Sequence, residues 1–335
     1  MPVKPVRLYS CFIAGFLCLL STNSFAGDLL HMLQRMADAD QQQNYRGTFI
    51  LRKSDSISTL QVTHGVDEKG VWESLEALDG EPRKVLRHNN SVISIYPQRK
   101  LLTVRQSDGV QPLHQQLPSD FNQLERHYSI EQRPDGRIAG HDTLVVDVLP
   151  RDDLRYGYRY WAEKDTGILL RCDLVDSHGE VIEQMMFTSL EYLDRVPHDA
   201  FDLKQYQQYD QQVLNEPDLK VDFDLLQWRA KQLPDGFILK QGHLRYLDPA
   251  HNAVREKVPG TAEPDLLHLV YSDGLASVSV FIEKNLGEDK HLQGGVTMGA
   301  LNAYGQPHDD FYVTAVGDVP MKTVKMIAGN MEYIH

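Results

Sequence analysis

The stretch His268-Leu-Val-Tyr-Ser-Asp-Gly-Leu-Ala-Ser-Val-Ser-Val-Phe-Ile-Glu283 is the clearest local indication of fold in the chain. Two apolar runs flank Ser272-Asp273-Gly274, and Asp-Gly is a strong turn signal because its backbone tolerates positive φ. In the second run the β-branched residues Val278, Val280 and Ile282 occupy alternate positions. This period of two is typical of a half-buried strand. The stretch therefore predicts a β-hairpin in an antiparallel sheet.

The residues on either side extend this module. A turn at Pro234-Asp235-Gly236 leads into an extended run that ends near Tyr246. Pro320 and Gly329 bracket a short helical segment, with the proline near its first turn and the glycine just past its end. We therefore expect residues 221–335 to form a small α+β domain, an antiparallel sheet with one helix.

Three segments carry a resemblance to a known family. Tyr271 to Glu283, Gly299-Ala-Leu-Asn-Ala-Tyr-Gly305 and Val313-Thr-Ala-Val-Gly-Asp-Val-Pro320 resemble, in order and spacing, the C-terminal domain of the MucB/RseB family. The resemblance extends weakly back to about Ala39. Members of that family are periplasmic negative regulators of the sigma-E (AlgU-type) envelope-stress response. The resemblance implies a non-enzymatic regulator that binds the periplasmic part of an RseA/MucA-like anti-sigma factor and protects it from proteolysis.

The first 26 residues have the pattern of a secretory signal peptide. Lys4 and Arg7 form its basic start, Leu8 to Leu20 its apolar middle, and Ser24-Phe25-Ala26 offers small residues to a signal peptidase. The apolar part is short for a membrane span, which makes an uncleaved anchor the less favoured alternative. We expect cleavage near Ala26 and a soluble periplasmic protein.

Charge and cysteine content narrow the class of protein further. Removing the leader takes the net charge from −13 to −15, so bulk charge argues against nucleic-acid binding. Of the 3 cysteines only Cys172 lies outside the leader, which excludes an intramolecular disulfide in the mature chain. The mature chain is long enough for two domains with ordinary hydrophobic cores.

Residues 27–197 read as a mainly β domain that follows one helix, which Asp28 can cap. Its strand and turn pattern is similar to that of the outer-membrane lipoprotein carriers, a half-open antiparallel β-barrel with helices across its mouth. A short helix is expected near 119–126. The expected strands are 48–53, 58–64, 71–75, 84–88, 91–96, 101–105, 128–132, 143–149, 156–163, 169–175 and 181–192.

Aromatic alternation suits an apolar concave face in this domain. Tyr156, Tyr158 and Tyr160 share one side of a strand, and Trp161 takes the other. In carrier-like folds such a face can hold acyl chains, and ligand pockets are mostly apolar with few polar anchors. Alternation alone cannot separate a hollow barrel from one filled by its own side chains, so an ordinary β core stays open as the alternative.

A basic window interrupts the acidic sequence between Pro82 and Ser107, where Asp and Glu are missing. Because Arg and Lys pair well with phosphate, this window predicts a site for lipopolysaccharide or another acylated anionic amphiphile. A solvated strand face with charged turns is the competing interpretation. The window's candidate ligand-binding residues are Arg83, Lys84, Arg87, Arg99, Lys100 and Arg105.

Residues 198–220 change composition to a polar, tyrosine-containing segment, which we interpret as a linker between the domains. The C-terminal sheet and this linker are expected to hold the anti-sigma factor, and amphiphile binding is expected to shift the domains and release it. A homo-oligomer is possible, and the sequence does not decide this. The candidate partner-binding residues are Tyr271, Phe281, Asn302 and Tyr304, each of which could equally be a core or turn residue.

Motifs of catalysis are not evident. The sequence has no phosphate-cradling loop, no Gly-x-Ser-x-Gly nucleophile elbow and no clustered metal ligands among its 14 histidines. Cys172 lies between apolar strand residues, which favours a buried, inert thiol over a nucleophile. We expect no catalytic residue, no cofactor and no metal. A periplasmic lipid or lipoprotein carrier is the alternative function, although carriers of this resemblance usually lack a second domain.

Overall fold

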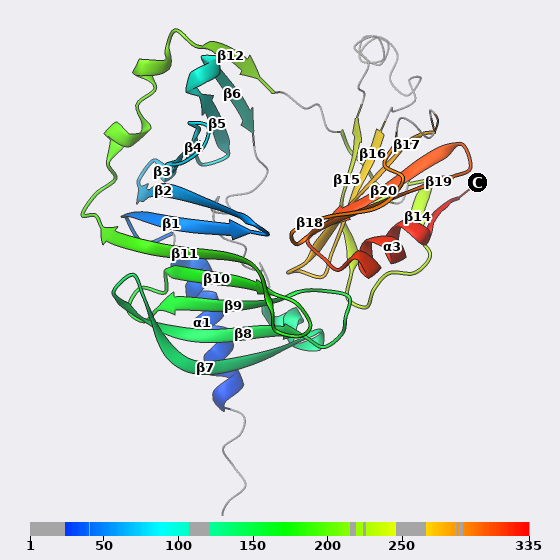
Figure 1. Ribbon diagram of the computed structural model, residues 1–335, viewed down its shortest axis with the longest axis horizontal. Helices are drawn as coiled ribbons and strands as arrows, with labels where there is room; N and C mark the ends of the chain where they lie inside the picture. The colour runs from blue at the N-terminus through cyan, green and yellow to red at the C-terminus, as the bar shows by residue number, and fades with distance from the viewer. Residues whose placement is uncertain are drawn as a thin grey trace, which may run out of the picture.

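Two β-rich domains lie side by side in the computed structural model (Figure 1). The structure describes residues 24–39, 41–106, 121–214, 219–223, 226–245, 266–285, 287 and 291–334. The predicted mainly β, two-domain architecture is confirmed. The larger sheet comprises β1 (Tyr45–Lys53), β2 (Ser56–Asp67), β3 (Gly70–Ala77), β4 (Lys84–His88), β5 (Ser91–Tyr96), β6 (Leu101–Gln106), β7 (Tyr128–Ile138), β8 (His141–Pro150), β9 (Gly157–Glu163), β10 (Leu169–Val175), β11 (Val181–Tyr192) and β12 (Asp210–Val213).

The larger sheet is an open, curved half-barrel. Its 12 strands have the order β12-β6-β5-β4-β3-β2-β1-β11-β10-β9-β8-β7, so β12 and β7 are its edges. Neighbouring strands are antiparallel apart from β12, which pairs with β6 in parallel. Closure would require a ladder between the two edges, and among the described residues no such ladder forms.

One helix packs on the inner face of this sheet. Helix α1 (Ser24–Ala39) buries Leu33 and Met36 against a core that includes Tyr158 and Tyr160 of β9. The 3-10 helix η2 (Phe121–Arg126) adds Leu124 to the same core. In Figure 1 α1 runs behind β7 to β11. This part of the inner face is therefore filled by the chain's own side chains.

The predicted linker packs on the outer face of the same sheet. Strands β4, β5 and β6, the last two joined through η1 (Pro97–Arg99), form a small apolar cluster with their outer side chains. The linker covers this cluster with two 3-10 helices, η3 (His198–Phe201) and η4 (Lys204–Tyr206), and the residues beside them. Its contacting side chains are Phe201, Leu203, Tyr206 and Tyr209. The segment then continues into β12 at the sheet edge.

The smaller domain is an antiparallel sheet with one helix, as expected. Its 7 strands have the order β13-β15-β16-β17-β20-β19-β18, and α3 (Met321–Gly329) packs on β18, β19 and β20. A separate pair joins β14 (Trp228–Ala230) to β21 (Met331–Tyr333). The strands of the sheet are β13 (Leu219–Lys220), β15 (Ile238–Arg245), β16 (Leu266–Ser272), β17 (Ser277–Lys284), β18 (Gly294–Met298), β19 (Leu301–His308) and β20 (Phe311–Gly317).

Most of the predicted leader, residues 1–23, lies outside the described part of the chain. The first helix starts at Ser24 in the structure, a little before the predicted Asp28. Within the described ranges, the helices are too short or too polar to cross a membrane.

Candidate functional site

The two domains meet through the segment Asp152–Tyr156 between β8 and β9, which we name the docking loop. Asp153 binds Lys322 at the start of α3, with Nζ 2.7 Å from Oδ2. The carbonyl of Leu154 accepts a hydrogen bond from the Thr323 hydroxyl at 2.5 Å. Consecutive residues of one domain therefore contact the start of a single helix in the other.

The centre of the contact is a buried ion pair between Arg155 and Asp273. Arg155 is 0% exposed, and its Nη1 donates to Asp273 Oδ2 at 2.5 Å. Its Nη2 donates to the carbonyl of Asp235 at 2.7 Å and to Asp152 at 2.9 Å. The hydroxyl of Tyr128 donates to Asp273 Oδ2 at 2.9 Å. We call this group the interdomain latch.

The surroundings of the latch favour its charged state. The guanidinium of Arg155 lies over the rings of Tyr128 and Phe237, 5.6 and 5.3 Å from their centroids. Burial lowers the pKa of Arg155, but hydrogen bonding to Asp152 and the charge of Asp273 outweigh it and leave that pKa raised. Burial, together with the Asp273 carboxylate, also raises the pKa of Tyr128. Arg155 therefore stays a cation and Tyr128 a neutral phenol at neutral pH.

Asp273 also holds its own hairpin turn. Its Oδ1 accepts the backbone N–H groups of Leu275 and Ala276 at 2.9 and 2.8 Å. This is the Asp-Gly turn that the sequence predicts between β16 and β17. One carboxylate therefore closes the turn with one oxygen and anchors the other domain with the second.

A further contact joins a turn of the C-terminal domain to strand β11 of the N-terminal domain. The turn between β18 and β19 presents Ala300, whose N–H donates to Glu183 Oε1 of β11 at 3.3 Å. Glu183 also pairs with Lys53 at 3.2 Å. Ala300 is fully buried within the core cluster of the N-terminal domain, and Leu275 packs against that cluster. The C-terminal domain therefore completes the core of the N-terminal one.

The predicted aromatic row does not stay together. Tyr158 and Tyr160 stack in parallel on the inner face, with ring centroids 5.6 Å apart, and burial raises the pKa of both. Tyr156 lies instead at the domain boundary, where its hydroxyl accepts a hydrogen bond from Asn302 Nδ2 at 3.2 Å. Trp161 takes the opposite face and stacks with Arg171. Two of the three tyrosines thus belong to the inner face.

The basic window divides between the two faces of the sheet. Arg87 of β4 aligns with Val92 of β5, which aligns with Arg105 of β6, so both arginines point to the inner face. Arg87 is 6% exposed, and its Nε and Nη1 have no hydrogen-bond partner. Arg105 is exposed. Lys84 takes the outer face and lies 3.9 Å from Glu76.

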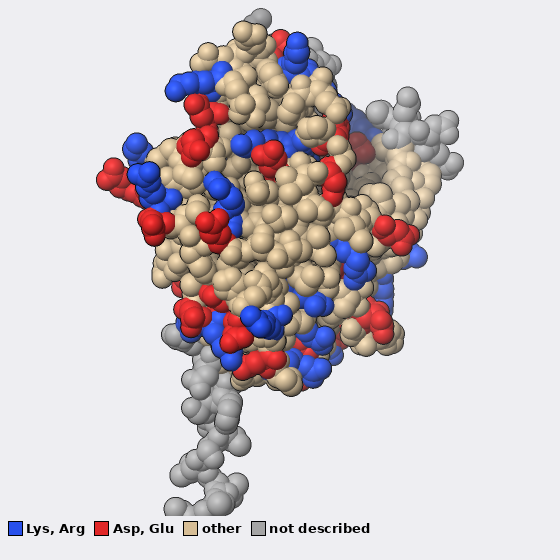
Figure 2. Space-filling model, turned by 60° about the vertical axis from the view of Figure 1, so that its left-hand side comes forward, with Lys and Arg blue, Asp and Glu red and all other residues tan. Residues whose placement is uncertain are grey.

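The remaining basic residues gather at one end of β5. Arg83 and Arg99 both lie over the ring of Tyr96, each 5.7 Å from its centroid, and Arg99 pairs with Glu81 at 3.1 Å. Lys100 is exposed in the following turn. On the face of the molecule that Figure 2 shows, basic and acidic side chains are interspersed, without a broad patch of one sign.

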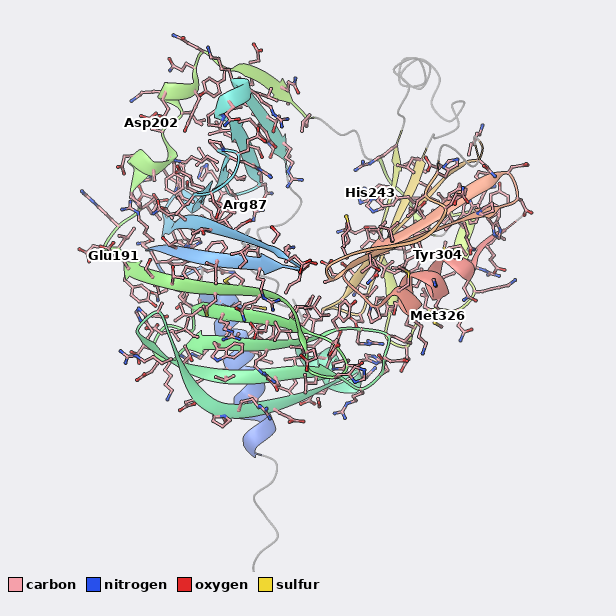
Figure 3. The ribbon with its side chains drawn as sticks, viewed as in Figure 1. Arg87, Glu191, Asp202, His243, Tyr304 and Met326 are labelled. Atoms are coloured by element: carbon pink, nitrogen blue, oxygen red, sulfur yellow. The ribbon has the colours of Figure 1, made fainter. Side chains whose placement is uncertain are left out.

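The four candidate partner-binding residues do not form one surface. Tyr271 and Asn302 are each 2% exposed, and burial raises the pKa of Tyr271 to about 12. Asn302 Nδ2 donates to the carbonyl of Val319 at 2.8 Å. Phe281 stacks on His268 on one face of the smaller sheet, with centroids 4.5 Å apart. Tyr304 lies on the other face beside α3, and Figure 3 shows it in the domain opposite Arg87.

Sequence reasoning missed the latch as a site. Tyr128, Arg155 and Asp273 lie far apart in the chain, and only Asp273 drew attention, as a turn residue. Tyr128 also lines a cavity of about 460 Å³ with Leu29, Glu125 and Arg151. In the part of the chain that the structure describes, His, Cys, Asp and Glu form no group of three or more able to hold a metal ion.

Comparisons with known proteins span both domains. The sigma factor AlgU regulatory protein MucB of Pseudomonas aeruginosa is 30% identical over 308 residues, which are 90% of each chain. The solved complex of Pseudomonas aeruginosa MucA and MucB superposes with a TM-score of 0.68 at 28% identity, covering 92% of this chain and 99% of that one. A crystal structure of MucB superposes with a TM-score of 0.60 at 26% identity, covering 92% of this chain and 98% of that one.

Models of protein families give the same assignment for both domains. The MucB/RseB N-terminal domain matches residues 28–205, and the MucB/RseB C-terminal domain matches residues 223–332. The chain belongs to the MucB/RseB family.

Proposed function

We propose that this chain is a periplasmic negative regulator of a sigma-E-type envelope-stress response. It binds the periplasmic part of a MucA/RseA-like anti-sigma factor and shields it from proteolysis, without catalysis of its own. The observation that carries this proposal is the full-length match to a MucB solved together with MucA, which spans both domains and the boundary between them. A carrier alone would not require the second domain.

Differences in burial support a different role for each pair of candidate partner-binding residues. Phe281 and Tyr304 are only partly buried, and they remain our candidates for direct contact. Tyr271 and Asn302 are core residues, so we assign them the role of holding the smaller sheet in shape. We keep the proposed division into a leader at 1–26, an N-terminal domain at 27–197, a linker at 198–220 and a C-terminal domain at 221–335.

We propose that lipopolysaccharide, or another acylated anionic amphiphile, binds the N-terminal domain and weakens partner binding. Support comes from the inner face of the larger sheet. On this face the apolar residues Val62 of β2 and Leu75 of β3 are succeeded, on the next strands, by Arg87 of β4 and Arg105 of β6. Coupling between two ligands must be reciprocal, so the partner lowers amphiphile affinity by the same factor, typically about 5- to 150-fold.

The partner test uses the mature chain and the periplasmic domain of the MucA-like anti-sigma factor from the same organism. Calorimetry should show binding, and the bound anti-sigma domain should resist its site-1 protease for longer than the free domain. A chain that binds no anti-sigma domain, but extracts lipid or lipoprotein from membranes, would be the carrier of the alternative hypothesis.

The amphiphile test compares a basic residue on the inner face of strands β4 to β6 with one on the outer face. Arg105→Glu should weaken lipopolysaccharide binding, more strongly at low salt because exposed charges are screened. Lys84→Glu introduces the same charge change on the outer face and serves as the matched control. Equal weakening by both substitutions would mean that net charge, and not the inner face, governs binding.

Export and assembly complete the proposal. The mature N-terminus should be Gly27, and the intact mass of protein recovered from the periplasm checks it. A mass that retains residues before Gly27 would contradict the soluble form.

Whether the protein forms a homo-oligomer is a separate question. Light scattering at several protein concentrations measures it.

A further inference from the structure

The interdomain latch contains a buried ion pair that is not needed for stability alone. Arg155 and Asp273 are both buried, and each belongs to a different domain. Apolar residues of similar volume often stabilise a site as well as a buried ion pair does, because desolvation offsets the attraction. A guanidinium fork, in contrast, bonds well in only a few orientations. The pair therefore specifies geometry, here the angle between two domains.

Tyr128 connects this geometry to the inner face. Its ring is fully buried in the core cluster that contains Tyr158, Tyr160 and the residues of α1, while its hydroxyl holds Asp273. Any ligand that displaces side chains of that cluster moves the ring that supports the latch. One side chain thus belongs both to the proposed ligand-binding face and to the domain boundary.

We propose that Arg155 is a positioning residue that holds the partner-binding arrangement of the domains, and that loss of its bond to Asp273 releases the partner. This inference rests on the proposed function and assigns its regulation to named atoms. Two solved complexes of MucB with MucA superpose on the latched structure with TM-scores of 0.68 and 0.66. We take the latched arrangement to be the binding one.

The test measures domain arrangement and partner affinity in the same full-length variants. Arg155→Met keeps an unbranched, apolar stem at this position but removes the guanidinium and with it the latch. Arg159→Met is the matched control, because Arg159 makes bonds of 2.5 and 2.9 Å to Asp147 within the N-terminal domain. Small-angle scattering gives the radius of gyration, and calorimetry gives the Kd for the anti-sigma domain.

We expect Arg155→Met to enlarge the radius of gyration and raise the Kd about tenfold. Arg159→Met should change neither, and Arg155→Lys should fall between Arg155→Met and the wild type. Wild-type values of both quantities in folded Arg155→Met would overturn the inference. If the wild type itself binds no anti-sigma domain, the proposed function fails, while the radius of gyration still reports whether the latch sets the arrangement.

A reversible disulfide tests whether Arg155 acts by fixing the arrangement of the domains or by stabilising the fold in general. A Cβ built at Gly299 lies 3.8 Å from Ser54 Cβ in the other domain, the usual separation in a disulfide. In the Arg155→Met background, oxidised Ser54→Cys/Gly299→Cys should restore both the radius of gyration and the Kd, and reduction should reverse this. Restored geometry without restored affinity would contradict the positioning role.

Tyr128→Phe tests the link to the ligand. It keeps the ring in the core and removes the hydroxyl that holds Asp273. The factor by which lipopolysaccharide raises the partner Kd should shrink at least threefold in this variant. An unchanged factor would show that the signal bypasses Tyr128.

Discussion

Arg155 at the domain boundary and the arginines of the basic window lie in opposite environments. At the boundary Arg155 is wholly enclosed and each of its nitrogens has a carboxylate or carbonyl acceptor. In the window Arg99 and Lys100 are exposed, and Arg87 is buried with two nitrogens unpartnered. Charge at the boundary is fully enclosed and bonded, whereas charge in the window is exposed or incompletely bonded. The contrast can be tested by substitutions on each side.

The largest effect is expected at Asp273. Asp273→Ala leaves Arg155 buried without its carboxylate and removes the acceptor for the Leu275 and Ala276 amides. Breaking a buried ion pair from one side costs about 3–5 kcal/mol, so the free energy of unfolding should fall by that amount in urea titration. Asp273→Asn keeps the acceptor for the turn and should cost less. Equal losses in the two variants would assign the whole effect to the broken ion pair and none to the turn.

A buried carboxylate inside one domain should give a smaller, pH-dependent effect. Glu163 accepts hydrogen bonds from Tyr192 and His141 at 2.7 and 3.0 Å, and also from Thr166. Burial raises its pKa, but these bonds together outweigh burial and leave the pKa below 4.5. Its stabilisation is therefore complete above about pH 4.5 and is lost as pH falls through the lowered folded pKa.

The measurement is the free energy of unfolding of Glu163→Gln against the wild type from pH 7 to pH 3. A loss of about 1.5–3 kcal/mol is expected at pH 7, the usual size for hydrogen bonds to a charged group. The difference should narrow below pH 4.5. A gap that stays constant with pH would show that the carboxylate charge does not contribute.

Arg87 should behave differently from Arg155. Arg87→Met removes two buried nitrogens that have no hydrogen-bond partner, but it also takes a cation from beside Glu73, which is 1% exposed and directly opposite on β3. The two effects oppose each other, so the free energy of unfolding should change by less than about 1 kcal/mol. The same variant should bind lipopolysaccharide more weakly. Nearly unchanged stability with weaker binding identifies a residue kept for a ligand, and a clear loss of stability would place Arg87 with the structural arginines.

The smallest effect belongs to Arg99. Its ion pair with Glu81 is exposed on both sides, and such pairs contribute about 0–1 kcal/mol. Arg99→Ala should leave the midpoint of thermal unfolding nearly unchanged at physiological salt. A large shift would mean that the contact of Arg99 with Tyr96 matters more than its charge.

Local patterns predicted the strands well, since alternation and turns are local properties. Lys84–His88, Ser91–Tyr96, Leu169–Val175 and Val181–Tyr192 form strands over the predicted residues. The pairing of β12 with β6 was missed because the polar Asp210–Val213 has no apolar alternation and depends on a distant edge. The latch was missed for the same reason. Polar Asn302 gives no sign in sequence that carbonyls of its own domain surround it.

The insertion of Ala300 into the core of the other domain has a consequence for the order of folding. A chain delivered from its N-terminus presents β1 long before β11, its sheet neighbour, so the larger sheet cannot form its centre early. Even with all its own strands present, its core still lacks Leu275 and Ala300. Until those residues arrive, the nascent half exposes an apolar gap to which a chaperone can bind. Maturation of this protein is thus expected to finish at both domains together.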